Sequence, residues 1–296
     1  MREIFKKVYY ELLCEYYTLS CPGMDIYEKI KYIFNKFLSI ILNKREIAFK
    51  NYKYHYDNRI GPAVFQIFPK EIERLKKIGL FNGVKSILDI GANTGQWSFA
   101  VKTLVNREMY IYSFEPIPQA YNSLYHNSIQ FKRWDCFNLA ISPNNKNYNF
   151  FYSPEGSTTG SFSKDKVEHN FERDNIELIK IKGTRLDKKN LNKYNIPLKV
   201  DLIKIDVEGY EFEILESIKD LSFNKVYVEI HLDNNYPREV DQFVSILEKK
   251  FNSKFKLIYL YKPKYTNKVV EVYLKKIKTA DNKQIIAQDF NISSLF

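Results

Sequence analysis

The chain has 296 residues, 45% of them hydrophobic, and a formal net charge of +11. This length is enough for one large domain, or for one catalytic domain with an appendage. No apolar run approaches the ~18 residues of a membrane span, the N-terminus lacks the apolar stretch of a secretory signal, and three cysteines without metal-ligand spacing favour a reducing compartment, the cytoplasm.

Residues 1–80 are predicted to form an N-terminal helical extension. Apolar residues recur at helical spacing over Ile4–Tyr16, and Asp25 with Glu28 resembles a capping box that opens a second helix. We expect this region to pack as a helical cap on the main domain. The alternative is an amphipathic helix within residues 1–50 that contacts a membrane surface or a partner.

Residues 81–296 are predicted to form an α/β domain. Short apolar segments alternate with helical patterns, which is typical of βαβ units and a mostly parallel sheet. The predicted strands are Val84–Ile90, Met109–Phe114, Phe131–Ile141, Val200–Asp206, Val226–Leu232, Phe255–Tyr261 and Val269–Leu274. The predicted helices are Gly95–Val105, Pro118–Asn127, Glu208–Ile218 and Arg238–Phe251.

Two features interrupt this alternation. The last two strands follow each other without a helix between them, so one is predicted to run antiparallel at the sheet edge. Residues 142–199 form an insertion with a short Gly- and Ser/Thr-rich, hairpin-like stretch, which we expect to lie over one end of the sheet.

The stretch "SILDIGANTGQWS" places a glycine turn between a strand and a helix. Gly91 and Gly95 let a ligand approach the backbone, and the helix that follows offers unpaired N–H groups. The spacing is neither G-x-G-x-x-G nor that of a phosphate-binding P-loop. The turn therefore indicates a nucleotide-like ligand, with a plain tight turn as the alternative.

Glu115 ends the second predicted strand, in "YSFEPIPQAY". An acid at that place in a doubly wound sheet accepts hydrogen bonds from ribose hydroxyls. The alternative is an ordinary exposed glutamate.

Acidic residues also follow two later strands. Asp206 and Glu208 come at the end of "VDLIKIDVEG", and Glu229 and His231 share one side of the strand "VYVEIHL". Two carboxylates and an imidazole at one sheet edge can take a proton from a substrate hydroxyl or hold a cation. We expect no metal, and the alternative is that some of these groups cap helices or pair with Lys204.

Together these motifs carry a resemblance. "LDIGANTGQWS", "FEPIPQAYNSLYHN", "NLAIS", "GSTTGSF", "IKIDVEGYEFEIL" and "VEIH" occur in this order, and the chain resembles the FkbM-type S-adenosylmethionine-dependent methyltransferases over about residues 84–232. The resemblance implies a Rossmann-like class I fold, with a seven-stranded mostly parallel sheet and helices on both faces. Tyr210 and Trp97 are bulkier than is usual at their positions.

The resemblance also implies roles for individual residues. S-adenosylmethionine is the implied cofactor, with Glu115 on its ribose. The residues implied to bind it are Asp89, Gly91, Ala92, Asn93, Gly95, Ser98, Glu115, Pro116, Asn138, Leu139, Ala140 and Asp206. The implied catalytic residues are Asp206, Glu208, Glu229 and His231, one of which would accept the proton.

The expected acceptor is a hydroxyl of a sugar, a glycan or a secondary metabolite. Two alternatives belong to other classes. The charge of +11 and the aromatic content suit an RNA methyltransferase, although no appended RNA-binding module is recognisable. A non-catalytic adapter that keeps the methyltransferase core is the other alternative, and the sequence leaves the oligomeric state undetermined.

Overall fold

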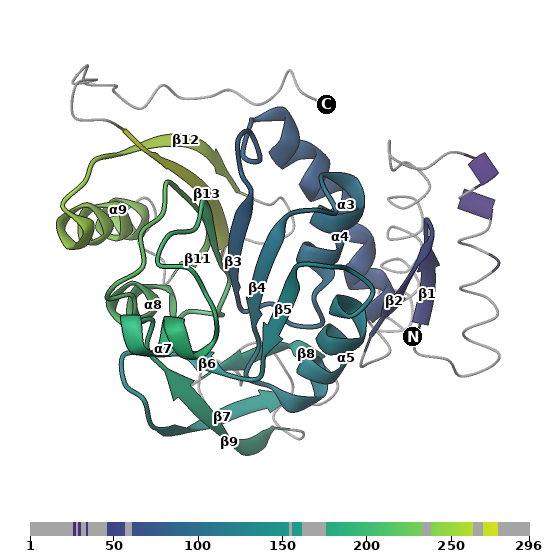
Figure 1. Cartoon of the computed structure of the whole chain (residues 1–296), viewed down its shortest axis with the longest axis horizontal. Coiled ribbons are helices and arrows are strands. Elements are labelled where there is room, and N and C mark those ends of the chain that lie inside the picture. Colours follow the sequence, from purple (N-terminus) through teal and green to yellow (C-terminus); the bar gives the residue numbers. More distant parts are fainter. Residues whose placement is uncertain are drawn as a thin grey trace, which may run out of the picture.

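A computed structural model describes residues 26–27, 29–30, 34, 46–56, 61–153, 156–161, 176–232, 238–262 and 269–277. A central twisted sheet lies between two groups of helices, and a smaller sheet lies across one end of it (Figure 1).

The central sheet has seven strands, as predicted. In chain order they are β3 (Ser86–Ile90), β4 (Tyr110–Phe114), β5 (Trp134–Phe137), β10 (Leu202–Ile205), β11 (Lys225–His231), β12 (Phe255–Tyr261) and β13 (Val269–Lys276). Their spatial order is β12-β13-β11-β10-β3-β4-β5. The order therefore reverses between β3 and β10, which is where ligands bind in doubly wound sheets.

One strand, β13, runs antiparallel to both of its neighbours, which confirms the predicted reversal. One of these two strands was predicted to lie at the edge, and that strand is β12, which pairs antiparallel with β13; β13 itself lies between β11 and β12. Burial explains the order. Val270 to Leu274 are all buried, which suits an interior strand, whereas most of β12 is only partly buried and suits an edge.

Helices cover both faces of the sheet, as the fold class requires. On one face lie α3 (Gly61–Lys77), α4 (Gln96–Leu104) and α5 (Pro118–Ser128); on the other lie α7 (Lys188–Lys193), α8 (Glu211–Ser217) and α9 (Arg238–Phe251) (Figure 1). Neighbouring residues of β3 serve the two faces: Ile87 packs beneath α3 and α4, and Leu88 packs beneath α8 and α9.

The insertion, together with the short strand just before it, forms a second, four-stranded sheet of order β6-β9-β7-β8. Its strands are β6 (Ala140–Ile141), β7 (Asn147–Ser153), β8 (Gly156–Ser161) and β9 (Glu177–Thr184). The hairpin-like stretch is confirmed as the antiparallel pair of β7 and β8. The predicted strand Phe131–Ile141 is two strands, β5 and β6, that belong to different sheets, because the chain leaves the central sheet after Phe137.

The N-terminal region is not helical throughout, so this part of the prediction is wrong. Residues 61–77 do form a helix, but β1 (Glu46–Phe49) and β2 (Tyr52–His55) form an antiparallel hairpin. Ile47 and Phe49 are buried with a less buried residue between them, which is the period of a strand. The aromatic ring of Phe49 packs 6.4 Å from that of Phe99 on α4.

Of the second predicted helix, residues 26, 27, 29, 30 and 34 are described, and they are helical. Ile26, Tyr27, Ile30 and Phe34 are exposed. The segment Ile4–Tyr16 and the capping residues Asp25 and Glu28 lie outside the described residues. Contact of residues 1–50 with a membrane or a partner stays a prediction.

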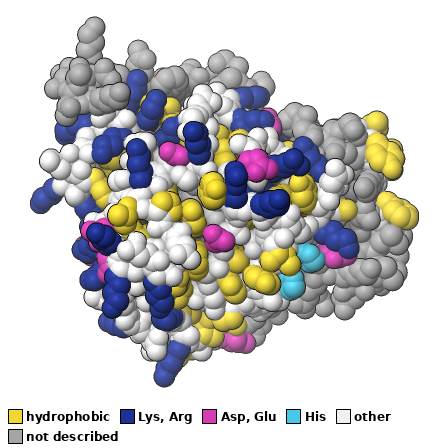
Figure 2. All heavy atoms as spheres, in the orientation of Figure 1, with side chains coloured by type: hydrophobic (Ala, Val, Ile, Leu, Met, Phe, Trp, Pro, Cys, Tyr) yellow, Lys and Arg dark blue, Asp and Glu magenta, His cyan; other side chains and the backbone are white. Residues whose placement is uncertain are grey.

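Lysine and arginine side chains are scattered over the face in Figure 2, with acidic and apolar groups between them. Among the described residues, no helix combines the length and the apolar character needed to cross a membrane.

Candidate active site

A sharp turn between β3 and α4 has a glycine at each end. Gly91 and Gly95 have φ angles of 77° and 84°, which side chains rarely tolerate. A Cβ atom on Gly91 would lie 1.7 Å from the carbonyl oxygen of Asp206, and one on Gly95 would lie 2.7 Å from Cδ1 of Leu124. Gly91 is therefore required by the backbone of the neighbouring strand end, whereas the sequence interpretation explained it by the approach of a ligand.

Lys204 of β10 joins this turn to the strand end that carries Asp206. Its Nζ lies 3.0 Å from the carbonyl oxygen of Gly91, 3.1 Å from Oδ1 of Asp89 and 3.2 Å from Oδ2 of Asp206. Burial alone would lower the pKa of Lys204, but the charges of Asp206 and Asp89 outweigh it and raise the pKa above its usual value. The lysine stays an ammonium and holds both sides of the switch point together.

Asp89 and Ser98 lie behind the turn. Both are fully buried, and Ser98 Oγ donates a 2.6 Å hydrogen bond to Asp89 Oδ2. The side chain of Asp89 also lies 3.1 Å from Nζ of Lys204, and its contact with a cofactor stays a prediction. The pair stabilises the turn from beneath.

Glu115 follows β4 and is buried. Its Oε2 accepts a 2.8 Å hydrogen bond from the backbone N–H of Asn93, and its Oε1 accepts one of 2.8 Å from Ile117. Asn93 itself has a φ of 52°, and the backbone N–H of Ala92 donates to Phe114 at 3.0 Å. The carboxylate therefore braces the glycine turn against the end of the neighbouring strand, at the edge where the sequence places it.

His231 lies at the centre of a cluster of carboxylates. Nε2 is 2.9 Å from Oε2 of Glu208, and Nδ1 is 2.7 Å from Oε1 of Glu211. Burial lowers the pKa of His231, but the hydrogen bonds to these two carboxylates outweigh it and raise the pKa to about 11. His231 is therefore an imidazolium at neutral pH.

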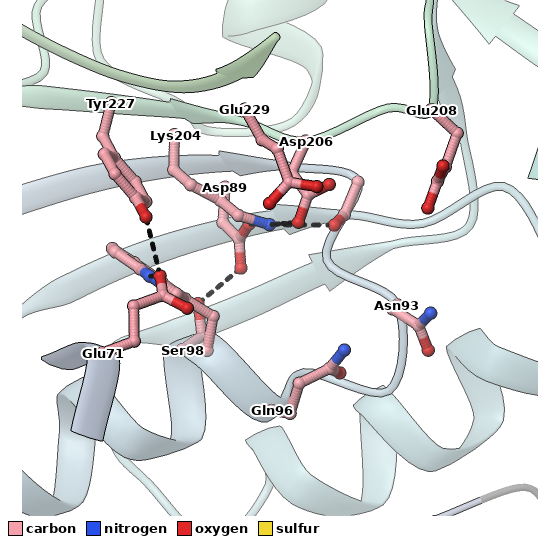
Figure 3. A network of polar contacts seen from close by, with 12 residues as sticks. Glu71, Asp89, Asn93, Gln96, Ser98, Lys204, Asp206, Glu208, Tyr227 and Glu229 are labelled. Carbon is pink, nitrogen blue, oxygen red and sulfur yellow. Dashed lines mark hydrogen bonds and ion pairs between the residues drawn. The ribbon is translucent and has the colours of Figure 1, made fainter. Parts of the chain in front are cut away.

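Glu229 and Asp206 complete the cluster, and Figure 3 shows their carboxyl groups side by side. Burial, the charge of Asp206 and that of Glu208 raise the pKa of Glu229 well above its usual range. Burial also raises the pKa of Glu208, against the opposing effect of His231. Among the described residues, no group of three or more His, Cys, Asp and Glu side chains is arranged to hold a metal ion.

A second buried polar network lies beneath the site. The hydroxyl of Tyr227 is 2.9 Å from Glu71 of α3 and 2.6 Å from Glu271 of β13. Glu71 also accepts from the indole of Trp97 at 3.1 Å, and Arg74 forms an ion pair with Glu271. Burial and the charge of Glu271 raise the pKa of Glu71 to about 8. This network ties α3 to the sheet.

The remaining predicted cofactor residues lie beyond β4 and β5. The side chain of Asn138 donates hydrogen bonds of 2.9 Å to the carbonyl of Glu115 and 3.0 Å to that of Pro116. Leu139 and Ala140 are buried, and the backbone N–H of Leu139 donates to Phe137. Asn138 thus holds the turn that follows Glu115.

Sequence reasoning gave no site role to Lys204, Glu211 or Gln96. Lys204 was treated only as a pairing partner, although a lone lysine in the apolar strand "LIKI" is itself a signal, since such a charge must be paired when buried. Glu211 was placed on a helix without a function. Nothing in the local pattern indicates that it meets His231, because they are on different elements.

Comparison with known proteins identifies the family of the chain. A family model described as "Methyltransferase FkbM domain" matches residues 89–255. The chain belongs to this methyltransferase family. No curated protein matches the chain.

Several solved structures share similarity with this FkbM methyltransferase at low identity. P. horikoshii TYW2 in complex with MeSAdo has 14% identity, covers 84% of each chain and has a TM-score of 0.46. A precorrin-6y C5,15-methyltransferase from Geobacter metallireducens has 14% identity over 70% of this chain and 86% of its own, with a TM-score of 0.39. An M. jannaschii TYW2 in complex with AdoMet has 16% identity over 70% and 76%, with a TM-score of 0.36.

The cofactor of FkbM methyltransferases is S-adenosylmethionine, and the residues present suit it. Its ammonium and sulfonium groups carry positive charge, and the carboxyl groups of Asp206, Glu208 and Glu229 lie beside the glycine turn (Figure 3). Its ribose requires acceptors, and the carboxylate of Glu115 lies at the end of the neighbouring strand. When bound, S-adenosylmethionine supplies an electrophilic methyl group.

Proposed function

We propose that this FkbM methyltransferase methylates a hydroxyl oxygen of a sugar, a glycan or another secondary metabolite, with Glu208 as the proton acceptor. Because the cofactor supplies the reactive methyl group, the protein needs to hold the hydroxyl oxygen in place and to accept its proton. The acidic cluster at the ends of β10 and β11 provides carboxylates for that second task.

The protonation states of the cluster support Glu208 over its neighbours. A pKa of about 11 makes His231 an imidazolium at neutral pH, and the pKa of Glu229, raised well above its usual range, favours its protonated form; neither form accepts a proton. The carboxylate of Asp206 is engaged in an ion pair with the buried ammonium of Lys204 at 3.2 Å. Glu208 is the remaining candidate for the proton acceptor. Burial raises its pKa, and a general base is most effective when its pKa lies near the pH of the reaction.

The backbone at Glu208 also supports this assignment. Its φ is 51°, a conformation that costs energy for a residue with a side chain, and the next residue, Gly209, has a φ of 87°. The bond from His231 to Oε2 of Glu208 keeps the side chain in this position. Asp206 and Glu229 would then orient the acceptor, Asp206 as an acceptor of hydrogen bonds and Glu229 as a donor.

The test is methyl transfer by the purified chain and by a Glu208→Gln variant. Radiolabelled S-adenosylmethionine would be supplied with methyl glycosides, oligosaccharides, phenols, amino sugars and total RNA as separate acceptors. We expect label on hydroxyl acceptors, and a loss of about 100-fold or more in kcat for Glu208→Gln, with cofactor affinity kept. An Asp206→Asn variant should lose less turnover than Glu208→Gln.

Two results would overturn this proposal. Full turnover by Glu208→Gln would rule out Glu208 as the proton acceptor. Label in RNA alone would favour the RNA methyltransferase alternative. We also propose that the chain works in the cytoplasm, because its three cysteines lack metal-ligand spacing and do not form an even disulfide set.

A further inference from the structure

The N-terminal hairpin reaches the glycine turn, although it lies outside the residues that match the family. The hydroxyl of Tyr54 on β2 is 2.5 Å from Oγ1 of Thr94, which stands in the middle of the turn. Both side chains are buried. A contact between residues so far apart in the chain is a tertiary link between the hairpin and the proposed cofactor site.

Asn127 of α5 makes a second link beside the first. Its Nδ2 donates to the carbonyl of Thr94 at 2.7 Å and to that of His55 at 2.8 Å, and its Oδ1 accepts from the backbone N–H of His55 at 2.7 Å. Asn127 is fully buried. The side chain and the backbone of Thr94 are therefore both held by elements outside the turn.

The hydrogen bond of Thr94 continues to Gln96. Oγ1 of Thr94 donates to Oε1 of Gln96 at 2.8 Å. Because a hydroxyl has only one O–H donor, Thr94 must accept the hydrogen bond from the hydroxyl of Tyr54. The direction of the relay is thus Tyr54 to Thr94 to Gln96. Because the amide oxygen of Gln96 faces Thr94, its NH₂ group is turned away from Thr94.

Gln96 is the first residue of α4, and only 7% of it is exposed. Figure 3 shows its amide nitrogen directed toward the space bounded by Asn93 and the acidic strand ends. The N-terminus of α4 carries the positive end of the helix dipole at the same place. Two N–H donors and a helix N-terminus favour an anionic group.

We infer that Gln96 binds the carboxylate of S-adenosylmethionine, and that Tyr54 and Thr94 are positioning residues that orient its amide. This inference rests on the proposed function, since it takes the glycine turn as the cofactor site. The charge distribution supports it: the carboxylates of Asp206 and Glu208 suit the positive groups of the cofactor and disfavour its carboxylate beside them. The carboxylate is then expected on the opposite side, where Gln96 lies.

The test compares two ligands by calorimetric titration of the full chain. S-adenosylmethionine carries the carboxylate, and decarboxylated S-adenosylmethionine lacks it but keeps the amine and the sulfonium. Gln96→Leu should weaken binding of the first ligand about tenfold or more, as expected for a hydrogen bond to a charged group, and should leave binding of the second nearly unchanged.

The positioning residues have their own variants. Tyr54→Phe and Thr94→Val should each weaken S-adenosylmethionine binding about three- to tenfold, while Thr94→Ser keeps the hydroxyl and should restore it. The double variant of Tyr54→Phe and Thr94→Val should lose no more than Thr94→Val alone, because both act through one relay. Hydrogen exchange of the amides of residues 91–97, measured without ligand, should be faster in Tyr54→Phe.

The matched control is Tyr227→Phe, which removes another buried, hydrogen-bonded tyrosine hydroxyl but does not contact the turn. It should lower stability and leave both affinities unchanged. An equal loss of affinity for both ligands in Gln96→Leu would overturn this inference and leave the proposed function standing. Wild-type affinity in Tyr54→Phe and Thr94→Val would do the same. Failure of the wild-type chain to bind either ligand would instead overturn the cofactor assignment and the carboxylate role with it.

Discussion

The Nζ atom of Lys204 lies 3.0 Å from the carbonyl oxygen of Gly91, across the point where the order of the strands reverses. The same ammonium contacts Asp206 at 3.2 Å, so a single buried charge connects the glycine turn to the acidic cluster. Cofactor binding and the placement of the acidic residues should therefore change together when this lysine is altered.

Replacement of Lys204 by methionine should lower the free energy of unfolding by about 3–5 kcal/mol, because Asp89 would be left as a buried charge without its partner. It should also weaken binding of S-adenosylmethionine. Denaturant unfolding and calorimetric titration measure the two effects.

The control for this lysine is Lys225→Met. Nζ of Lys225 is also buried, but it donates to the carbonyls of Leu80 and Asn82, both at 2.7 Å, and does not contact the glycine turn. It should lose stability and keep cofactor affinity. Equal affinity losses in the two variants would show that Lys204 has no specific link to the turn.

Gly91→Ala should destabilise the protein far more than Gly83→Ala, although both glycines have a positive φ. Nothing lies within 4 Å of a Cβ atom on Gly83, so that variant bears only the backbone strain of about 1–2 kcal/mol. On Gly91 the Cβ atom would clash with the backbone of Asp206. Thermal unfolding of both variants tests this, and similar melting temperatures would contradict it.

His231→Gln should change how stability depends on pH. Burial lowers the pKa of His231, but Glu208 and Glu211 outweigh it and raise the pKa to about 11, against 6.5 in the unfolded chain. The stabilisation by the charged imidazole is therefore fully present below about pH 6.5 and is lost as the pH rises toward 11. The free energy of unfolding should be measured from about pH 6 to 10 for both proteins, and the difference in favour of the wild type should shrink as the pH rises. A difference that does not change with pH would show that His231 is not an imidazolium.

Glu71→Gln should become the more stable form as the pH rises. Burial and the charge of Glu271 raise the pKa of Glu71 to about 8 from 4.5, so the native state favours its neutral form. The stability linked to that proton is fully present below about pH 4.5 and is lost as the pH rises through 8, whereas glutamine does not ionise.

The control on the same helix is Glu73→Gln, whose carboxylate pairs with Lys76 at 3.0 Å near the surface. The difference in the free energy of unfolding between the wild type and Glu71→Gln should change between about pH 5 and pH 9. The same difference for Glu73→Gln should stay constant. A constant offset for Glu71→Gln as well would mean that Glu71 is ionised throughout.

Much of the central sheet could be predicted because its signals are local. Alternating apolar strands and helices, the glycine turn and the acidic residues after β10 and β11 are all readable within short windows. The hairpin of residues 46–55 was missed because its residues become a buried strand pair only through contact with distant aromatic rings, such as that of Phe99. The sequence also left open which of the last two strands lies at the edge, since this depends on which neighbours bury each strand.

By itself, the sequence determined the α/β class, the family, and the set of acids that meet at one sheet edge. These follow from periodicity and from the rule that parallel strands end at the same edge. Only the tertiary structure decided what those acids do. Protonation depends on burial and on charges from other elements, which is why His231 is held as a cation by Glu211 and why Lys204 became the link between the two halves of the site.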